Sequence, residues 1–236
     1  MSNGIKVKKR NGRGTEALNL EKMHKMVEEA TTGLAGVSAS QVEIQSGIQF
    51  YDGITTAEIQ EILIKSASDL IDLEHPNYQF VAARLLLFSI RKSLYGRSRE
   101  LPNLEDHIVK CVTQEVYDGD IYSKYSKEDI EKANGYIDHN RDFLFTYAGL
   151  RQVVDKYLVQ DRSTGQVFET PQFMYMMIAL TIFAEYPKET RLNYVRRYYD
   201  AISRHRINIP TPIMAGVRTP IRQFASCVLV DADDTL

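Results

Sequence analysis

Apolar residues recur at helical spacing in the N-terminal part of the chain, which predicts a small helical bundle. The clearest apolar stripe lies in residues 20–30 and is made of Leu20, Met23, Met26 and Val27. Asn19 stands just before this segment as a helix N-cap. Further helices are expected over 40–48, after a cap at Thr55 or Thr56, and over 78–95, which is apolar nearly all round and therefore central.

A short hairpin is predicted ahead of these helices. Residues 5–10 alternate apolar and basic positions, Asn11-Gly12 marks a turn, and residues 15–18 can return as a second strand. The N-terminal part is therefore expected to be a small β-cap on a helical bundle.

The polar stretch 98–103 separates this bundle from a second helical part. It contains Pro102 and follows Gly96, so we predict one domain over 1–96 and another over 97–236. The helices predicted in the second part are 104–116, 127–137, 143–157, 170–185 and 187–203. A hairpin is expected to interrupt them, with strands at 157–160 and 166–169 around a turn at Gly165.

The C-terminal segment changes character. Prolines between Pro210 and Pro220 fix φ and remove backbone donors, so a rigid, extended lead-in is predicted there rather than a helix. A mainly apolar run follows, and we expect it to form a strand over about 222–231 that is buried on both faces. Because an unpaired apolar strand is an aggregation hazard, we expect a continuation of the polypeptide, or a second chain, to complete the sheet.

Composition and charge narrow the class of protein. The 236 residues are 44% hydrophobic and 25% charged with a net charge of −2, which is typical of a globular protein without general affinity for nucleic acid. The longest apolar run, 173–184, falls short of the roughly 18–20 residues that a membrane span needs. The N-terminus lacks the apolar core of a signal peptide, so Cys111 and Cys227 are expected in a reducing cytoplasm. We expect no metal site, because no zinc-type spacing of cysteine or histidine occurs.

A set of residues near the N-terminus has the chemistry of a triphosphate site. Lys9 and Arg10 of the predicted hairpin precede a helix start, where backbone N–H groups and the helix dipole favour an anion. Lys92, at the end of another helix, can reach the same phosphates. The base and ribose can be read by polar side chains: Glu16, Asn19 and Thr56. The pattern alone favours the alternative that lysines on an edge strand only prevent edge-to-edge pairing.

Cys227 follows the proline-rich segment on the predicted strand. A cysteine on an apolar strand is most often a small core residue. Thr211, between two prolines, can in the same way simply satisfy a turn. The residue types alone therefore leave a structural role as the favoured interpretation of both.

The string PTPIMAGVRTPIRQFASCV (210–228) resembles the segment that enters the catalytic barrel of class I ribonucleotide reductase large subunits. The similarity starts at VKKRNG (7–12) and runs along the whole chain, which corresponds to about the first third of such a subunit. The resemblance implies a mainly α fold. An ATP-cone, with a small β-cap on a four-helix bundle, is followed by a helical domain and the first strand of an incomplete ten-stranded α/β barrel.

In such reductases the ATP-cone is the allosteric module that senses ATP against dATP and sets overall activity. By matching positions, the resemblance implies that it is lined by Lys9, Arg10, Glu16, Asn19, Lys22, Thr56, Gln60 and Lys92. Many members have a histidine where this chain has Gln60, and glutamine can hydrogen-bond a nucleotide but cannot become charged. The effectors implied are Mg-bound ATP, dATP and other dNTPs.

The resemblance also implies roles in catalysis. Thr211 and Ser226 hydrogen-bond the substrate, with Thr211 near its diphosphate, and Cys227 is one of two reducing thiols. Removing the ribose 2′-hydroxyl as water takes two electrons from two sulfurs, so Cys227 ends each turnover in a disulfide with a distant cysteine. Cys111 lies in a different part of the fold and is expected to be structural.

The acidic C-terminal end has two interpretations. An acidic tail is usually just solvated. The resemblance implies instead that Asp234, with Thr235 and Leu236 beside it, helps to bind the specificity effector, a nucleoside triphosphate that selects which base is reduced.

The partners implied are the remaining C-terminal fragment of the large subunit, a large-subunit dimer, a radical-generating small subunit with a di-iron tyrosyl radical, and thioredoxin or glutaredoxin. Ribonucleoside diphosphates are the implied substrates. We expect a naturally split subunit, least surprising in a phage genome, that is inactive alone; a prematurely terminated chain is the alternative. A rival from another class is a non-catalytic ATP- or dATP-sensing protein that docks onto a partner through 97–236.

Overall fold

The computed structural model describes residues 4–9, 14–96, 100–221 and 223–230. This part of the chain is mainly helical, as predicted, and its only sheet is a two-stranded hairpin. The chain divides into two compact units: Met1–Leu101 with Asp142–Gln152, and Pro102–Arg141 with Val153–Leu236. The domains predicted over 1–96 and 97–236 stay a prediction.

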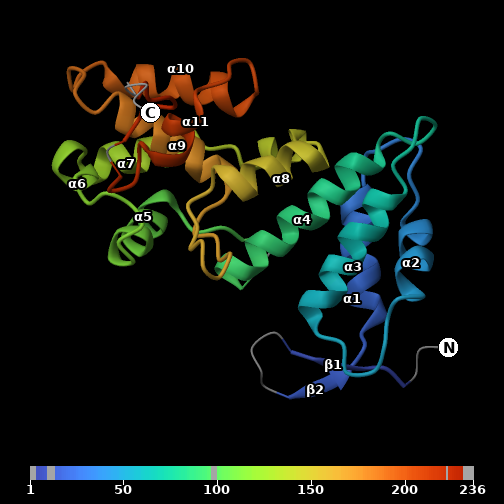
Figure 1. Cartoon of the computed structure of the whole chain (residues 1–236). Coiled ribbons are helices and arrows are strands. Elements are labelled where there is room, and N and C mark those ends of the chain that lie inside the picture. Colours follow the sequence, from blue (N-terminus) through green and yellow to red (C-terminus); the bar gives the residue numbers. More distant parts are fainter. Residues whose placement is uncertain (1–3, 10–13, 97–99, 222, 231–236) are drawn as a thin grey trace, which may run out of the picture. The chain divides into compact units, whose positions relative to one another are not determined.

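The first unit follows the predicted order of a hairpin and four helices (Figure 1). The strands pair antiparallel, with Val7 opposite Glu16. Its elements are β1 (Lys6–Lys8), β2 (Thr15–Ala17), α1 (Leu20–Thr31), α2 (Ala39–Gly47), α3 (Thr56–Asp69) and α4 (Tyr78–Tyr95). The predictions of the hairpin and of these helices are confirmed to within a residue or two at their ends.

Helix α4 is the centre of the first unit. It packs against α3 and α1, and its side chains from Val81 to Arg91 are buried apart from Arg84. The buried Arg91 guanidinium binds the Asp142 carboxylate at 2.8 Å, and Phe143 lies edge-on to Phe88. These contacts explain why residues 142–152 belong to the first unit although they are distant in sequence.

The hairpin is fixed by the loop that leads into α3. Lys8 N–H donates to the carbonyl of Ile54 at 2.9 Å, and Gly53 N–H donates to the carbonyl of Lys6 at 2.8 Å. Gly53 has φ +83°, a conformation that side-chain-bearing residues rarely adopt, and this allows the loop to turn against β1. The β-cap is thereby set beside the first turn of α3.

The second unit is built around α9, whose residues Pro171–Leu180 are all buried, as expected for the long apolar run. Pro171 occupies the first turn of this helix, where proline is tolerated. The helices are α5 (Leu104–Thr113), α6 (Ile121–Lys124), α7 (Lys127–Asn134), the 3₁₀ helix η1 (His139–Leu144), α8 (Tyr147–Lys156), α9 (Pro171–Ile182), α10 (Arg191–Ser203) and α11 (Thr211–Gly216). Both η1 and α8 begin in one unit and end in the other.

The prediction of an extended lead-in after Pro210 is wrong, because residues Thr211–Gly216 form helix α11. Proline is compatible with the first turn of a helix, and Pro212 occupies that position here. The segment after α11 folds back onto this helix. A Cβ atom placed on Gly216 would lie 3.7 Å from Cε1 of the Phe224 ring.

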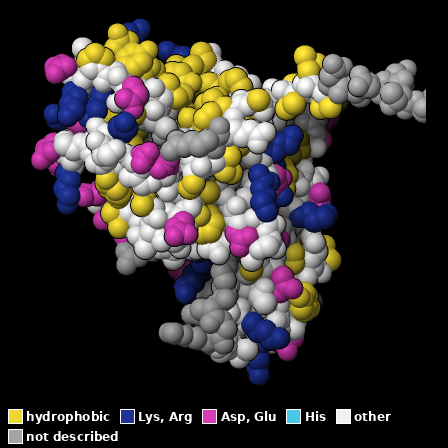
Figure 2. Space-filling model, turned by 60° about the vertical axis from the view of Figure 1, so that its left-hand side comes forward, with side chains coloured by type: hydrophobic (Ala, Val, Ile, Leu, Met, Phe, Trp, Pro, Cys, Tyr) yellow, Lys and Arg dark blue, Asp and Glu magenta, His cyan; other side chains and the backbone are white. Residues whose placement is uncertain are grey.

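Two predicted strand pairings are not formed as expected. The hairpin expected around Gly165 is reduced to one bridge between Gln160 and Val167. Over the described residues 223–230 the strand predicted for 222–231 is absent, because no described segment pairs with it. Leu229 and Val230 are instead 102% and 81% exposed. They join the hydrophobic side chains that lie at the surface among charged ones, as Figure 2 illustrates for one face of the molecule.

Candidate functional site

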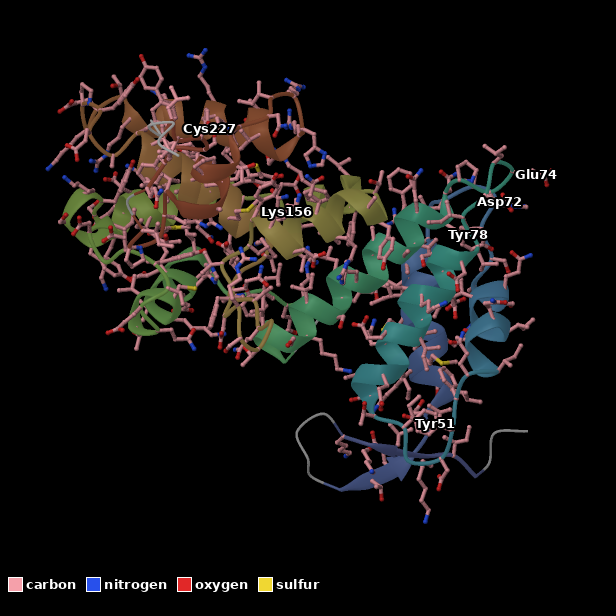
Figure 3. All side chains as sticks on the ribbon, in the orientation of Figure 1. Tyr51, Asp72, Glu74, Tyr78, Lys156 and Cys227 are labelled. Carbon is pink, nitrogen blue, oxygen red and sulfur yellow. The ribbon has the colours of Figure 1, made fainter. Side chains whose placement is uncertain are left out.

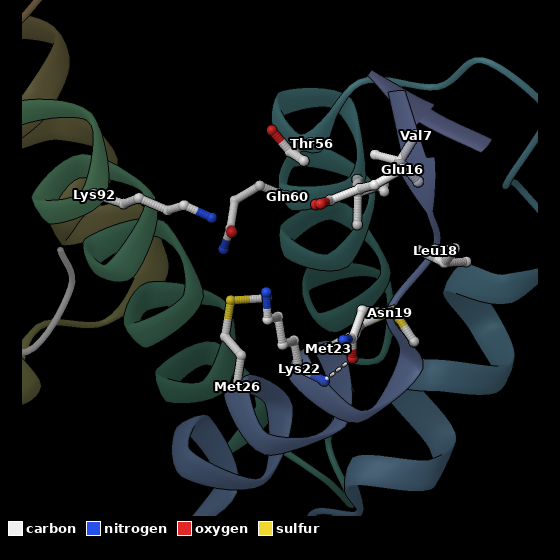
Figure 4. Close-up of a pocket in the computed structure, with 11 residues that line it drawn as sticks. Val7, Glu16, Leu18, Asn19, Lys22, Met23, Met26, Thr56, Gln60 and Lys92 are labelled. Atoms are coloured by element: carbon white, nitrogen blue, oxygen red, sulfur yellow. Dashed lines mark hydrogen bonds between the residues drawn. The ribbon is translucent and has the colours of Figure 1, made fainter. Parts of the chain in front are cut away.

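A pocket in the first unit collects residues from β1, β2, α1, α3 and α4 (Figure 4). Side chains from β2, α1, α3 and α4 point toward one another around it. It is lined by Val7, Glu16, Leu18, Asn19, Lys22, Met23, Met26, Thr56, Ile59, Gln60 and Lys92. The predicted residues Glu16, Asn19, Lys22, Thr56, Gln60 and Lys92 are thus brought together, although they come from distant parts of the sequence.

Positive charge surrounds the single carboxylate that lines the pocket. Lys9 Nζ lies 2.9 Å from Glu16 Oε2. Lys9 does not line the pocket itself but is ion-paired with Glu16, which does. This hydrogen bond lowers the pKa of Glu16, and the nearby charges of Lys22 and Lys92 lower the same pKa further. Three lysines, one from the residue after β1 and two from α1 and α4, therefore converge on one small region. The predicted Arg10 lies outside the described residues.

Helix caps decide which hydroxyl and amide groups face the pocket. Asn19 Oδ1 accepts from Lys22 N–H at 2.8 Å, which confirms Asn19 as the cap of α1. At α3 the cap is Thr55, whose side chain and Glu58 form a capping box. Thr56 is therefore the first residue of α3, and its side chain lines the pocket.

Gln60 occupies the pocket wall under tight constraint. The residue is only 4% exposed, and its Nε2 donates to the backbone carbonyl of Leu85 at 3.1 Å. That bond occupies the amide nitrogen and leaves the side-chain oxygen as a hydrogen-bond acceptor in the pocket wall. Figure 4 shows Lys92 reaching from α4 toward this amide.

An apolar surface completes the pocket, and the sequence reasoning did not assign it to the site. It consists of Val7, Leu18, Met23, Met26 and Ile59. Met23 and Met26 were recognised only as members of the apolar stripe of the first helix. Their positions about one and two turns beyond Asn19, a cap residue that also lines the pocket, are the signal that identifies them.

The second set of predicted residues is exposed. Ser226 Oγ lies 3.8 Å from Cys227 Sγ, and both residues are exposed. Figure 3 labels Cys227 in the second unit. Thr211 begins α11 and is also exposed, and its hydroxyl lies 3.4 Å from the phenol of Tyr157. The predicted effector residues Asp234, Thr235 and Leu236 lie outside the described part of the chain.

A buried polar network lies beneath this surface and was not predicted. Arg218 donates from Nε to Glu169 Oε2 at 2.9 Å, and Glu169 also accepts from the phenol of Tyr117. The Tyr117 hydroxyl lies 3.0 Å from His107 Nε2. Because the phenol donates to Glu169, His107 donates to the phenol from Nε2. The occurrence of Arg218 within the string at 210–228 is the signal that marks it.

Burial sets the protonation of this network. It lowers the pKa of His107 to about 3, so the imidazole is neutral at physiological pH. Burial also raises the pKa of the Cys111 thiol to about 12, and the carboxylate of Glu169 acts in the same direction. A thiol in that state is a poor nucleophile, which agrees with the structural role expected for Cys111.

Among the residues that the structure describes, no group of three or more His, Cys, Asp or Glu is placed to hold a metal ion. None of the described helices combines the length and apolar character that crossing a bilayer requires.

Comparisons with known proteins agree with this architecture. The family model for the ATP cone domain matches residues 5–93, and the model for the all-alpha domain of ribonucleotide reductase matches residues 143–222. The fold is thus an ATP cone, a nucleotide-effector domain, followed by the helical domain of a reductase. The chain belongs to the ribonucleotide reductase large subunits and corresponds to their N-terminal portion.

Individual relatives give the extent of the match. The chain is 50% identical over its whole length to ribonucleoside-diphosphate reductase 1 subunit alpha of Escherichia coli (strain K12) and to the alpha subunit of Haemophilus influenzae. It is 45% identical over 90% of its length to the alpha subunit of Enterobacteria phage T4. The chain spans 31% of the two bacterial relatives and 28% of the phage relative.

Proposed function

We propose that this chain supplies the effector-binding unit and one reducing thiol of a ribonucleoside-diphosphate reductase, which converts ribonucleoside diphosphates to deoxyribonucleoside diphosphates. The observation that carries the proposal is the pocket of the first unit. Residues expected for an ATP-cone converge there from the hairpin, α1, α3 and α4. The identity to reductase alpha subunits extends to the segment of Thr211, Ser226 and Cys227.

The pocket suits a nucleoside triphosphate because it combines separate chemical regions. Lys22 and Lys92, with Lys9 beside Glu16, supply positive charge for the phosphates, and the family resemblance adds Arg10 to this set. The apolar side chains of α1 and α3 offer a surface for the base. Glu16 can accept hydrogen bonds from the amino group or ribose hydroxyls, as can the Gln60 oxygen. We propose ATP and dATP, with bound Mg, as the effectors.

In the second unit, Cys227 acts as one of two reducing thiols. The ribose 2′-hydroxyl leaves as water, and the two electrons come from two thiols that become one disulfide. The second thiol and the radical that activates the 3′ carbon belong to the rest of the assembly. Thr211 and Ser226 hydrogen-bond the substrate, and Asp234, Thr235 and Leu236 contribute to the specificity effector.

This reaction requires partners. They are the remaining part of the large subunit, a second large subunit, a small subunit that carries the di-iron tyrosyl radical, and thioredoxin or glutaredoxin to reduce the disulfide. The exposed apolar run at 228–230 supports the first of these, since a strand buried between neighbours would cover it. The chain alone is expected to form no deoxyribonucleotide.

Ligand-dependent stability tests the effector site. Mg-ATP or Mg-dATP at one hundred times its dissociation constant should stabilise the chain by about 2.7 kcal/mol. The pair Lys9→Ala with Arg10→Ala should abolish this gain. The matched pair Lys25→Ala with Lys65→Ala removes the same charge from exposed positions, where these lysines pair with Glu21 and Asp69, and should retain it. A wild-type chain that no nucleotide stabilises would contradict the effector site.

Cys227 separates catalysis from the rival function. In the assembly with the rest of the large subunit and the small subunit, Cys227→Ser should abolish formation of deoxyribonucleoside diphosphate with a thioredoxin reductant. Cys111→Ala, which removes the buried thiol, should retain it. Retained formation in Cys227→Ser would instead support a non-catalytic sensor of ATP or dATP that docks onto a partner.

A further inference from the structure

Arg218 and Glu169 form an ion pair that is completely buried in the second unit. Besides Glu169, the guanidinium donates from Nη1 to the carbonyl of Met214 and from Nη2 to the carbonyl of Tyr157 at 2.8 Å. Desolvation of two charges largely cancels their attraction, so a buried ion pair is a poor source of stability. The ion pair does, however, fix the positions of the groups that it binds relative to one another.

The ion pair holds two segments: the residues just after α8, which ends at Lys156, and helix α11. On one side, Glu169 Oε1 accepts from Val159 N–H at 2.7 Å while Arg218 binds the carbonyl of Tyr157. On the other side, Met214 lies inside α11. The ion pair therefore connects residues 157–159 to α11 through direct hydrogen bonds.

The Tyr157 phenol lies where these two segments meet. Its backbone N–H donates to the carbonyl of Val153 at 2.9 Å, at the end of α8, where Figure 3 labels the preceding residue Lys156. Its hydroxyl lies 3.4 Å from Thr211 Oγ1, and Thr211 is exposed. When the phenol donates to the threonine oxygen, the threonine hydrogen is directed outward and can be donated to an anionic oxygen.

We infer that Tyr157 is a positioning residue for Thr211, with the Arg218–Glu169 pair holding the two hydroxyls within reach of each other. The inference rests on the proposed function, in which Thr211 binds the substrate diphosphate. Tyr157 acts through Thr211 and does not itself touch the substrate. Its loss therefore weakens substrate binding and leaves the chemistry of the thiols unchanged.

The test uses the complete reductase assembly with a ribonucleoside diphosphate as substrate. Tyr157→Phe should raise KM about three- to tenfold, the effect of losing one neutral hydrogen bond, and keep kcat within about twofold. Tyr125→Phe is the matched control, because its phenol donates to the carbonyl of Leu180 at 2.8 Å in the same unit. This control should lower the melting temperature and leave KM unchanged.

A double-mutant cycle shows whether the phenol acts through Thr211. Thr211→Val should raise KM, and adding Tyr157→Phe should raise it no further, whereas in Thr211→Ser the dependence on Tyr157 should return. An unchanged KM in Tyr157→Phe, or additive effects with Thr211→Val, would overturn the inference alone. A wild-type assembly that forms no deoxyribonucleoside diphosphate would overturn the proposed function, and the inference with it.

Discussion

The two candidate sites differ in how much of their surroundings the chain provides. Around the pocket of the first unit, the hairpin, α1, α3 and α4 all contribute side chains, and the wall residue Gln60 is buried and hydrogen-bonded. Around Cys227 the described residues form no such wall. The thiol is exposed, and the apolar residues that follow it are exposed as well.

Under the proposed function, this difference reflects the different demands that binding and catalysis place on a fold. A nucleotide pocket needs convergent charges on one compact unit, and local elements can supply them. A reduction that must exclude water and bring two thiols together needs a closed chamber. The second unit nevertheless encloses the buried Arg218–Glu169 pair, which also binds helix α11.

The largest effect is expected when the buried ion pair is broken. Glu169→Ala leaves the Arg218 guanidinium buried without its carboxylate, which should cost about 3–5 kcal/mol of stability. Hydrogen-exchange mass spectrometry should show faster exchange in α5 and α9, while α1 and α4 keep their protection.

The control for this variant is Lys124→Ala, which breaks an exposed ion pair with Glu185 and should cost at most about 1 kcal/mol. Faster exchange of α1 and α4 in Glu169→Ala would mean that the two units unfold together. The comparison between them would then fail.

Acid should also separate the two units. The folded second unit holds His107 neutral down to a pKa of about 3, whereas the unfolded chain binds a proton near pH 6.5. As the pH is lowered from 6.5, the unfolded state therefore gains the proton first. The free energy of unfolding should decrease by about 1.4 kcal/mol for each pH unit down to about pH 3. Denaturation of wild type and of His107→Gln across this range should show a shallower dependence in the variant.

In the first unit the sign is opposite. A hydrogen bond to Glu43 raises the pKa of His24, so this contact stabilises the folded state at low pH and its contribution is lost as the pH rises through the raised pKa. The amide hydrogen-exchange rates of α1 and α2 should therefore differ most between wild type and His24→Gln under mildly acidic conditions. Equal rates in both proteins at all pH values would contradict this sign.

A smaller effect is expected from one lysine of the pocket. Lys22→Ala should weaken Mg-ATP binding by roughly 10- to 150-fold, since a hydrogen bond to a charged group is worth about 1.5–3 kcal/mol. Isothermal titration calorimetry measures the change. Lys25→Ala, one turn further along α1 and paired with Glu21 at 2.7 Å, should bind as the wild type does. Equal losses in both variants would indicate a general effect of charge and not a site.

The smallest effects on stability are expected from two helix N-caps, one that lines the pocket and one that does not. Asn19→Ala and Ser38→Ala each remove an N-cap, of α1 and α2, and each should cost about 1 kcal/mol in thermal unfolding. Asn19→Ala should also weaken nucleotide binding, because Asn19 lines the pocket. A similar loss of affinity in Ser38→Ala would mean that the pocket responds to bundle stability in general.

Most helices of both units and the cap at Asn19 were predictable, because apolar periodicity and capping are local properties of the chain. Residue chemistry already suggested a shared triphosphate site for Glu16, Asn19, Thr56 and Lys92, whereas Lys22 and Gln60 were predictable only through the resemblance. Periodicity places each residue on a helix face but does not say which faces meet.

Helix α11 and the charged network were missed for a related reason. Proline fixes φ at a value that both an extended chain and a first helical turn accept, so Pro212 could not decide between them. The hydrogen bond from Arg218 to Met214 closes the end of α11, and Arg218 is itself held by Glu169 from a distant segment. Pairings of this kind depend on tertiary structure.

The cap of α1 provides a built-in reporter for the pocket. The amide proton of Lys22 is bonded to Asn19, and the side chains of both residues line the cavity. A guest molecule that restrains Asn19 would also suppress fraying of the first turn, so the chemical shift of this single backbone resonance should register occupancy directly.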